Sequence, residues 1–95
     1  MQSKPKASII GQGYVGLPLA IAASEAGLEV NGIDIDSKKI ELINSGKSPV
    51  EDISDARLQK ALASNTYKAT TDFSKISDSN VIIICVPTPL DGDLK

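Results

Sequence analysis

Three glycines near the start of the chain have a spacing that suits a phosphate group. Gly11, Gly13 and Gly16 form the pattern G-x-G-x-x-G. In such a pattern the first glycine permits a tight turn after a strand, the second lets a pyrophosphate approach the backbone, and the third lets the next helix pack closely. The N-terminus of that helix offers free N–H groups and partial positive charge. The pattern predicts a dinucleotide site, to which Tyr14 and Val15 contribute mainly their backbone amides.

Asp34 supplies the acidic group that this kind of site uses. It follows Gly11 by 23 residues and ends the next predicted strand. A carboxylate there accepts hydrogen bonds from the hydroxyls of an adenosine ribose. Its negative charge also repels the 2′-phosphate of NADP, so we expect the cofactor to be NAD. Lys38 and Lys39 come soon after and could soften that repulsion, although we interpret Lys38 as part of a solvated helix face.

The elements that must position these residues alternate along the chain. The residue pattern predicts strands at 7–10, 29–33, 67–71 and 81–86, helices at 15–26 and 55–63, and a further helix between an N-cap at Ser37 and a stop at Gly46. This order predicts parallel pairing with right-handed crossovers. We therefore expect an α/β fold, the first half of a doubly wound Rossmann sheet with strand order 3-2-1-4 and helices mainly on one face.

The composition limits the alternatives. At 95 residues the chain makes one small domain, and its net charge of -2 with only three aromatic residues argues against a nucleic-acid or membrane partner. The single cysteine excludes an internal disulfide, and the lack of histidine argues against a zinc site. We see no secretory signal, and the longest apolar run, Val81 to Val86, is too short to span a bilayer. We expect a cytoplasmic protein.

Four segments resemble the UDP-glucose/GDP-mannose dehydrogenase family. They are Gly11-Gln-Gly-Tyr-Val-Gly-Leu-Pro-Leu-Ala20, Gly32-Ile-Asp-Ile-Asp36, Ile43-Asn-Ser-Gly-Lys-Ser-Pro49 and Cys85-Val-Pro-Thr-Pro-Leu90. The resemblance extends from about Ser8 to Leu90, and the last segment is more similar to enzymes acting on UDP-N-acetylhexosamines than to UDP-glucose dehydrogenases. It implies oxidation of the C6 alcohol of a nucleotide sugar to a carboxylate with two NAD per turnover, in the synthesis of bacterial surface polysaccharides.

The resemblance also implies particular cofactor contacts. Tyr14 and Val15 match residues at the pyrophosphate, Asp34 matches the carboxylate at the adenosine ribose, and Lys39 matches a basic residue beside that ribose. Thr88 matches a threonine in the loop after the fourth strand, which ends at the edge of the cofactor crevice.

In the family a nucleophilic cysteine, a lysine and an asparagine perform the oxidation, and they lie downstream of the last residue here. Cys85 falls within the predicted fourth strand, where we expect it to be buried and inert. We therefore interpret residues 1–95 as a truncated N-terminal NAD-binding Rossmann domain that is inactive alone and meets the nucleotide sugar only together with the missing half. The face and edge of Val81 to Val86 should then be open, which predicts self-association as a dimer or with exchanged segments.

Other interpretations share part of this pattern. The chain could be a nucleotide-binding module without catalysis, or a structural fragment that stays folded by association. A 3-hydroxyacid or 6-phosphogluconate type of dehydrogenase has a similar opening, but the Val-Pro-Thr-Pro segment argues against it. A methyltransferase that uses S-adenosylmethionine also has a glycine turn, but the complete three-glycine spacing favours a pyrophosphate ligand.

Overall fold

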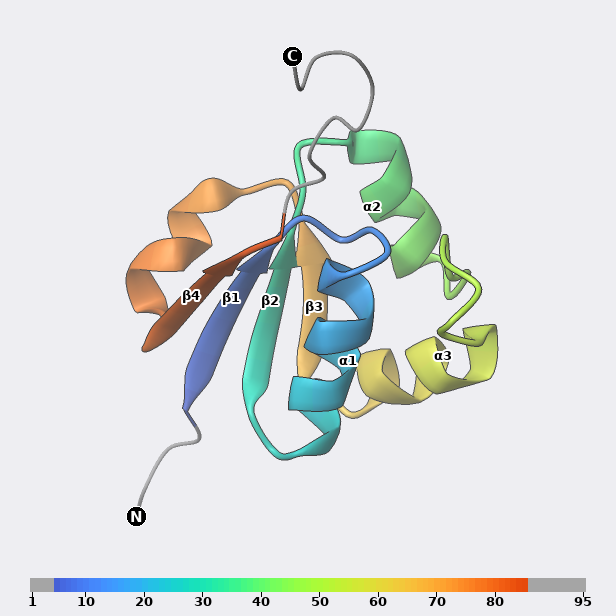
Figure 1. Cartoon of the computed structure of the whole chain (residues 1–95), viewed down its shortest axis with the longest axis horizontal. Coiled ribbons are helices and arrows are strands. Elements are labelled where there is room, and N and C mark those ends of the chain that lie inside the picture. Colours follow the sequence, from blue (N-terminus) through green and yellow to red (C-terminus); the bar gives the residue numbers. More distant parts are fainter. Residues whose placement is uncertain (1–4, 86–95) are drawn as a thin grey trace, which may run out of the picture.

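The computed structural model describes residues 5–85, which form a four-stranded sheet with three α-helices and one 3-10 helix (Figure 1). The strands are β1 (Lys6–Ile10), β2 (Glu29–Ile33), β3 (Tyr67–Thr70) and β4 (Val81–Ile84). All pairs are parallel and the order across the sheet is β3-β2-β1-β4. The predicted α/β class and strand order are confirmed.

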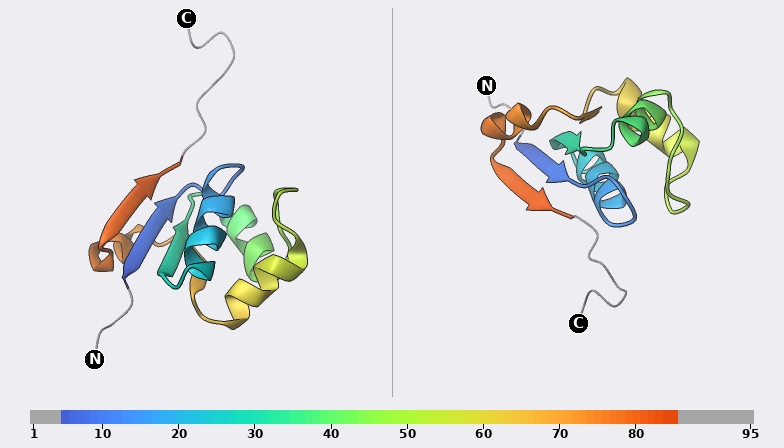
Figure 2. Two further views of the ribbon diagram at one scale, coloured as in Figure 1. Left: turned by 60° about the horizontal axis from the view of Figure 1, so that its bottom comes forward. Right: turned by 90° about the horizontal axis from the view of Figure 1, so that it is seen from above.

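The three α-helices lie on the front side of the sheet in Figure 1, toward β2 and β3, and leave β4 uncovered. Helix α1 (Gly16–Glu25) lies across the middle strands, and α2 (Ser37–Asn44) and α3 (Asp55–Ala63) continue the layer beside β3. The 3-10 helix η1 (Phe73–Asp78) lies on the opposite face, where the chain crosses from β3 to β4 (Figure 2). The predicted helices on one face are confirmed, whereas η1 was not predicted.

Alternation along the strands explains the two faces of the sheet. On β1, Ile9 points toward α1 and is fully buried, while the adjacent Ser8 points the other way and its hydroxyl contacts that of Ser79 beside η1. The apolar layer between sheet and helices is continuous and includes Leu17, Ile21, Val30, Ile43, Leu58 and Tyr67. This layer holds the strand ends and the start of α1 in fixed positions.

Glycines and short polar side chains set the helix ends. Gly27 and Gly46 have φ of 105° and 91° and directly follow the last turns of α1 and α2, as their places in the sequence predict. The predicted N-cap at Ser37 is wrong. Asp36 is extended and its carboxylate accepts from the backbone N–H groups of Lys38 and Lys39, so Ser37 is already the first helical residue.

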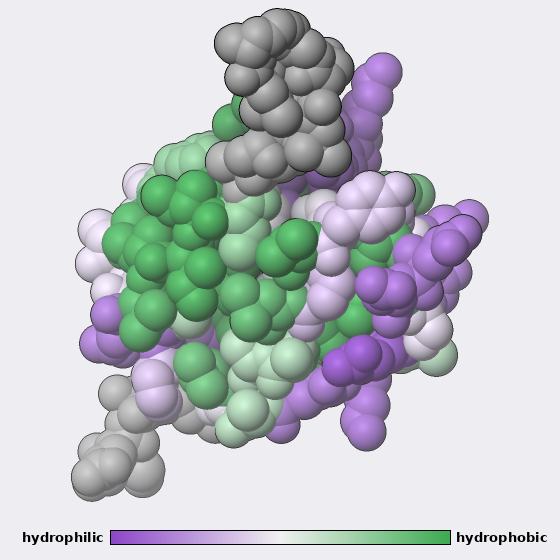
Figure 3. Space-filling model, viewed as in Figure 1, coloured by the Kyte–Doolittle hydropathy of each residue, from purple (hydrophilic) through white to green (hydrophobic). Residues whose placement is uncertain are grey.

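Strand β4 is an open edge of the sheet. Its apolar sequence is typical of a strand covered on both faces, yet Val81 and Ile82 are about half exposed and Ile84 is 67% exposed. Figure 3 shows the corresponding apolar surface over β4 and its neighbour β1. In the described part of the chain this edge and its side chains remain uncovered, as expected from the sequence.

None of the helices formed by residues 5–85 has both the length and the apolar character needed to cross a membrane. The same residues contain no group of three His, Cys, Asp or Glu side chains arranged to hold a metal ion.

Candidate cofactor-binding site

The glycine turn begins where β1 ends. Gly11 has a φ of 97°, a conformation that L side chains rarely adopt, so the turn needs glycine at this position. Its N–H donates to the carbonyl of Ile33 at 2.6 Å, which extends the pairing of β1 with β2 up to the turn. The turn and the end of β2 are therefore held side by side at the carboxyl edge of the sheet.

The other two glycines of the motif have different surroundings. A Cβ atom on Gly16 would lie 1.5 Å from the carbonyl oxygen of Gly11, so no side chain fits where α1 approaches the turn. A Cβ atom on Gly13 would meet only the Nζ of Lys39, at 3.8 Å. Gly16 thus permits the close helix–strand contact, whereas Gly13 leaves its backbone open to a ligand.

Helix α1 differs from the other helices in how it begins. Side chains of Asp36, Ser54 and Asp72 cap α2, α3 and η1. No side chain caps α1, whose N-cap is Val15, and its first turn carries no acidic residue. The N–H of Leu17 donates to the Gly13 carbonyl at 3.1 Å, and Pro18 has no N–H. This end of α1 therefore offers an anion beside Gly13 the N–H of Gly16 and the positive end of the helix dipole.

Asp34 lies directly after β2 and faces this turn. Its Oδ2 accepts from the backbone N–H of Gln12 at 2.9 Å, and its Oδ1 accepts from that of Asp36, also at 2.9 Å. Burial alone would raise the pKa of the Asp34 carboxyl, but these two N–H groups and the ammonium of Lys39 together lower it below its ordinary value. Asp34 is therefore a carboxylate at neutral pH, with lone pairs left for a hydroxyl donor.

Lys39 reaches back from the first turn of α2 to the same carboxylate. Its Nζ lies 3.3 Å from Oδ2 of Asp34 and also stands over Gly13. Lys38 is exposed and only its backbone N–H makes a contact, with Asp36, as expected for a residue on a solvated helix face. The structure thus brings Lys39, and not Lys38, to the acidic side chain.

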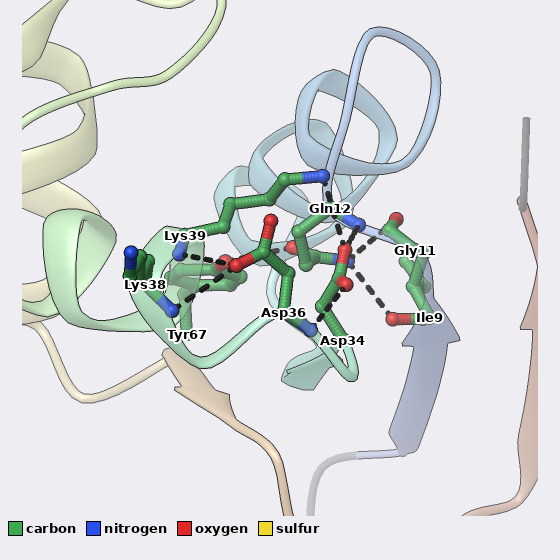
Figure 4. A network of polar contacts seen from close by, with 8 residues as sticks. All are labelled: Ile9, Gly11, Gln12, Asp34, Asp36, Lys38, Lys39 and Tyr67. Atoms are coloured by element: carbon green, nitrogen blue, oxygen red, sulfur yellow. Dashed lines mark hydrogen bonds and ion pairs between the residues drawn. The ribbon is translucent and has the colours of Figure 1, made fainter.

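Sequence reasoning missed two residues below the turn. The side chain of Gln12 is fully buried, its Nε2 donates to the carbonyls of Ile9 and Gly11, and its Oε1 accepts from the Tyr67 hydroxyl at 2.7 Å. Figure 4 shows this cluster next to Asp34 and Lys39. The available signal was a polar residue at the variable position of the motif, but nothing in the sequence connects it to a residue on β3.

Several apolar side chains project into solvent around the turn. Tyr14 is 81% and Ile35 is 82% exposed, and Val15 is also exposed. Tyr14 and Val15 were predicted to contribute through their backbone amides, which stays a prediction. Ile35, directly after Asp34, was not predicted as a site residue. Thr88 lies outside the described residues.

Cys85 is partly buried against the core, and its N–H donates to the carbonyl of Ile10 at 2.7 Å. It was expected to be buried within the fourth strand, whereas β4 ends at Ile84 and Cys85 follows it. The difference follows from the open edge at β4, which leaves one side of this residue uncovered.

These features place the chain among the dinucleotide-binding domains of the Rossmann class, in which the ligand lies at the carboxyl ends of parallel strands. A comparison with known protein families then identifies the family within this class. Residues 5–95 match the NAD binding domain of the UDP-glucose/GDP-mannose dehydrogenase family, and the chain belongs to this family.

Two curated relatives illustrate the similarity. The chain is 50% identical over 91 residues to GDP-mannose 6-dehydrogenase of Pseudomonas aeruginosa, a match that covers 92% of this chain and 21% of the relative. It is 44% identical over 87 residues to UDP-N-acetyl-D-mannosamine dehydrogenase of Pyrococcus horikoshii, covering 90% and 21%. An uncharacterized protein of Methanocaldococcus jannaschii is 42% identical over 86 residues. The chain spans between a tenth and about a fifth of the length of these relatives.

Solved structures agree. A ternary complex of GDP-mannose dehydrogenase from Pseudomonas aeruginosa superposes with a TM-score of 0.83 at 47% identity, over 92% of this chain and 20% of that one. UDP-N-acetylmannosamine dehydrogenase from Pyrococcus horikoshii gives 0.85 at 43% identity, over 93% and 21%. The chain is thus the NAD-binding domain of a nucleotide-sugar dehydrogenase family.

Proposed function

We propose that this domain holds NAD at the carboxyl ends of β1 and β2. In this proposal the pyrophosphate lies on the backbone of Gly13, Tyr14 and Val15 at the N-terminus of α1. Gly11 and Gly16 shape the turn that makes this approach possible. The observation that carries the proposal is the start of α1, which lacks a side-chain cap although the other three helices have one.

The adenosine half of the cofactor is proposed to bind beside Asp34. Its Oδ1 accepts a hydrogen bond from the backbone N–H of Asp36, and a carboxylate oxygen can accept a second from a ribose hydroxyl. Lys39 holds this carboxylate through the ion pair, and the exposed Ile35 offers an apolar surface for the adenine ring. Thr88 remains a proposed contact on the strength of the family resemblance alone.

The decisive experiment is a titration of the 95-residue chain with NAD and with NADP. Calorimetry measures the affinity, and NMR chemical shifts identify the amides that are affected. We expect NAD to bind more tightly than NADP and to shift the amides of Gly13 to Gly16 and Asp34. Replacing Asp34 with alanine should weaken NAD by about tenfold, the value of one good hydrogen bond to a charged group, and reduce the preference over NADP.

Two results would contradict this assignment. Unchanged affinity of Asp34→Ala for both cofactors would remove Asp34 from the site. Absence of NAD binding at millimolar cofactor would refute the proposal that this chain holds NAD. Ser37→Ala serves as a control, because Ser37 is exposed at the start of α2 and makes no contact with the turn.

For the whole protein we propose a nucleotide-sugar 6-dehydrogenase, which converts the C6 alcohol of the sugar to a carboxylate. Bound NAD would supply the hydride acceptor, two per turnover. Support comes from family membership and from relatives named for GDP-mannose and for UDP-N-acetyl-D-mannosamine. The Val-Pro-Thr-Pro-Leu segment favours a UDP-N-acetylhexosamine as substrate, and NADH formation with each nucleotide sugar would decide between them.

We further propose that the isolated chain associates with a second copy through β4. Self-association is the alternative that does not involve catalysis. The observation that favours it is that β4 is an edge strand with exposed aliphatic side chains. The two proposals are compatible, because Asp34 follows β2, and β1 lies between β2 and β4 in the sheet.

A further inference from the structure

The peptide group between Gly11 and Gln12 is held at both of its ends. Its carbonyl oxygen, on Gly11, accepts from the side-chain Nε2 of Gln12 at 3.0 Å. Its N–H, on Gln12, donates to Oδ2 of Asp34 at 2.9 Å. Because the peptide is trans, these two groups point in opposite directions. The orientation of this one peptide therefore determines both the inner wall of the glycine turn and one hydrogen bond of the proposed ribose carboxylate.

Tyr67 completes the hydrogen bonds of the Gln12 amide. The amide NH₂ group has two donors, and the carbonyls of Ile9 and Gly11 accept both. Its oxygen is then directed to β3, where the Tyr67 hydroxyl donates to it. A reversed amide would place its oxygen against two carbonyl oxygens, so these carbonyls set the orientation. The Tyr67 hydroxyl then donates to the amide oxygen and holds the side chain in that orientation.

The surrounding residues exclude solvent from the Gln12–Tyr67 hydrogen bond and fix the two side chains. Tyr67 is 1% exposed and the Gln12 side chain is fully buried. Burial, together with the nearby charge of Asp34, raises the pKa of the Tyr67 hydroxyl, so it remains a donor at physiological pH. Gly32 on β2 provides the space, because a Cβ atom there would lie 2.4 Å from Oε1 of Gln12 and 2.7 Å from the Tyr67 hydroxyl.

We propose that Tyr67 and Gln12 are positioning residues for the cofactor, which hold the Gly11–Gln12 peptide and Asp34 in the orientation that binds NAD. This inference rests on the proposed function, which places NAD at the same turn. Tyr67 acts through Gln12, 55 residues earlier in the chain, and does not itself touch the ligand.

The test compares two variants that each lose one buried hydroxyl. Tyr67→Phe keeps the ring and removes the donor to Gln12. Ser24→Ala is the matched control, because the buried Ser24 hydroxyl bonds to that of Thr66 at the far end of α1. The first readout is NAD affinity by calorimetry, and the second is the pKa of Asp34 in the ligand-free chain, followed by its carboxyl NMR shift. Lys39 and the Asp36 N–H act on that carboxyl in all variants.

We expect Tyr67→Phe to weaken NAD by about tenfold, as for the loss of one buried hydrogen bond. The pKa of Asp34 should rise toward its ordinary value, because a released Gly11–Gln12 peptide no longer directs its N–H at the carboxylate. Ser24→Ala should leave both readouts unchanged even where it lowers stability. If Tyr67→Phe fails to fold, Gln12→Met keeps the chain length of the side chain, removes the amide and should give the same two shifts.

Three results would contradict the positioning role of Tyr67 or the proposed NAD site. Equal NAD affinity and equal Asp34 pKa in Tyr67→Phe and the unaltered chain would refute the positioning role while the NAD site stands. Equal losses in Tyr67→Phe and Ser24→Ala would reduce Tyr67 to a stabilising residue. If the unaltered chain binds no NAD, the proposed function fails for this chain and the cofactor role of Tyr67 with it, and the Asp34 pKa alone then decides whether the peptide is held as described.

Discussion

At the scale of single residues, Gly13 and Gly16 are chemically identical but occupy different environments. A methyl group at Gly16 would overlap the Gly11 carbonyl oxygen, 1.5 Å away, so α1 or the turn must shift. We expect Gly16→Ala to lower the free energy of unfolding by about 3 kcal/mol, the upper part of the range for overpacking. Urea unfolding followed by circular dichroism measures this.

Gly13→Ala is the matched counterpart. Its φ lies outside the left-handed region and its Cβ would have ordinary contacts only, so stability should change by no more than about 0.5 kcal/mol. NAD affinity should nevertheless fall, because the added methyl occupies the surface proposed for the pyrophosphate. Equal destabilisation by both substitutions would contradict the division of roles between the two glycines.

At the scale of elements, the start of α2 tests the corrected cap. Asp36→Ala removes the acceptor for the N–H groups of Lys38 and Lys39 and should lower the free energy of unfolding by about 1 kcal/mol. Ser37→Ala leaves that cap intact and should have almost no effect, since alanine is a better helix former than serine. Thermal unfolding of the two variants measures the difference, and the reverse order would restore Ser37 as the cap.

The same elements show what could be predicted from the sequence. Hydrophobic patterns and glycines predicted four strands and three helices, because each of these signals lies within a few neighbouring residues. The strand order followed from the Rossmann class that the alternation of strands and helices indicates. Two adjacent cap-forming residues, Asp36 and Ser37, could not be separated, since the choice depends on how the chain leaves β2. The 3-10 helix η1 is short and polar and has no helical periodicity. The Gln12–Tyr67 pair was missed because its partners come together only after β1, β2 and β3 assemble.

At the scale of the whole molecule, we expect the open edge of the sheet at β4 to pair with a second copy of the chain. We expect light scattering of the isolated chain to give about twice the 10.0 kDa mass of one copy, through pairing of β4 with β4. Ile84 is 67% exposed, so Ile84→Lys should return the chain to a monomer with little cost to folding. A monomer at high protein concentration in the unaltered chain would refute this proposal.

The position of the tyrosines has an optical consequence. The chain has no tryptophan and two tyrosines, so light of a wavelength that phenylalanine does not absorb excites Tyr14 and Tyr67 alone. Tyr14 lies in the glycine turn and its side chain is exposed to solvent. Tyr67 is buried, and its hydroxyl donates to the side-chain amide of Gln12. A quencher dissolved in the buffer therefore reaches the first fluorophore and not the second. The emission that the quencher removes therefore reports on what covers the turn at Tyr14. The emission that resists the quencher reports on the packing beneath the turn at Tyr67.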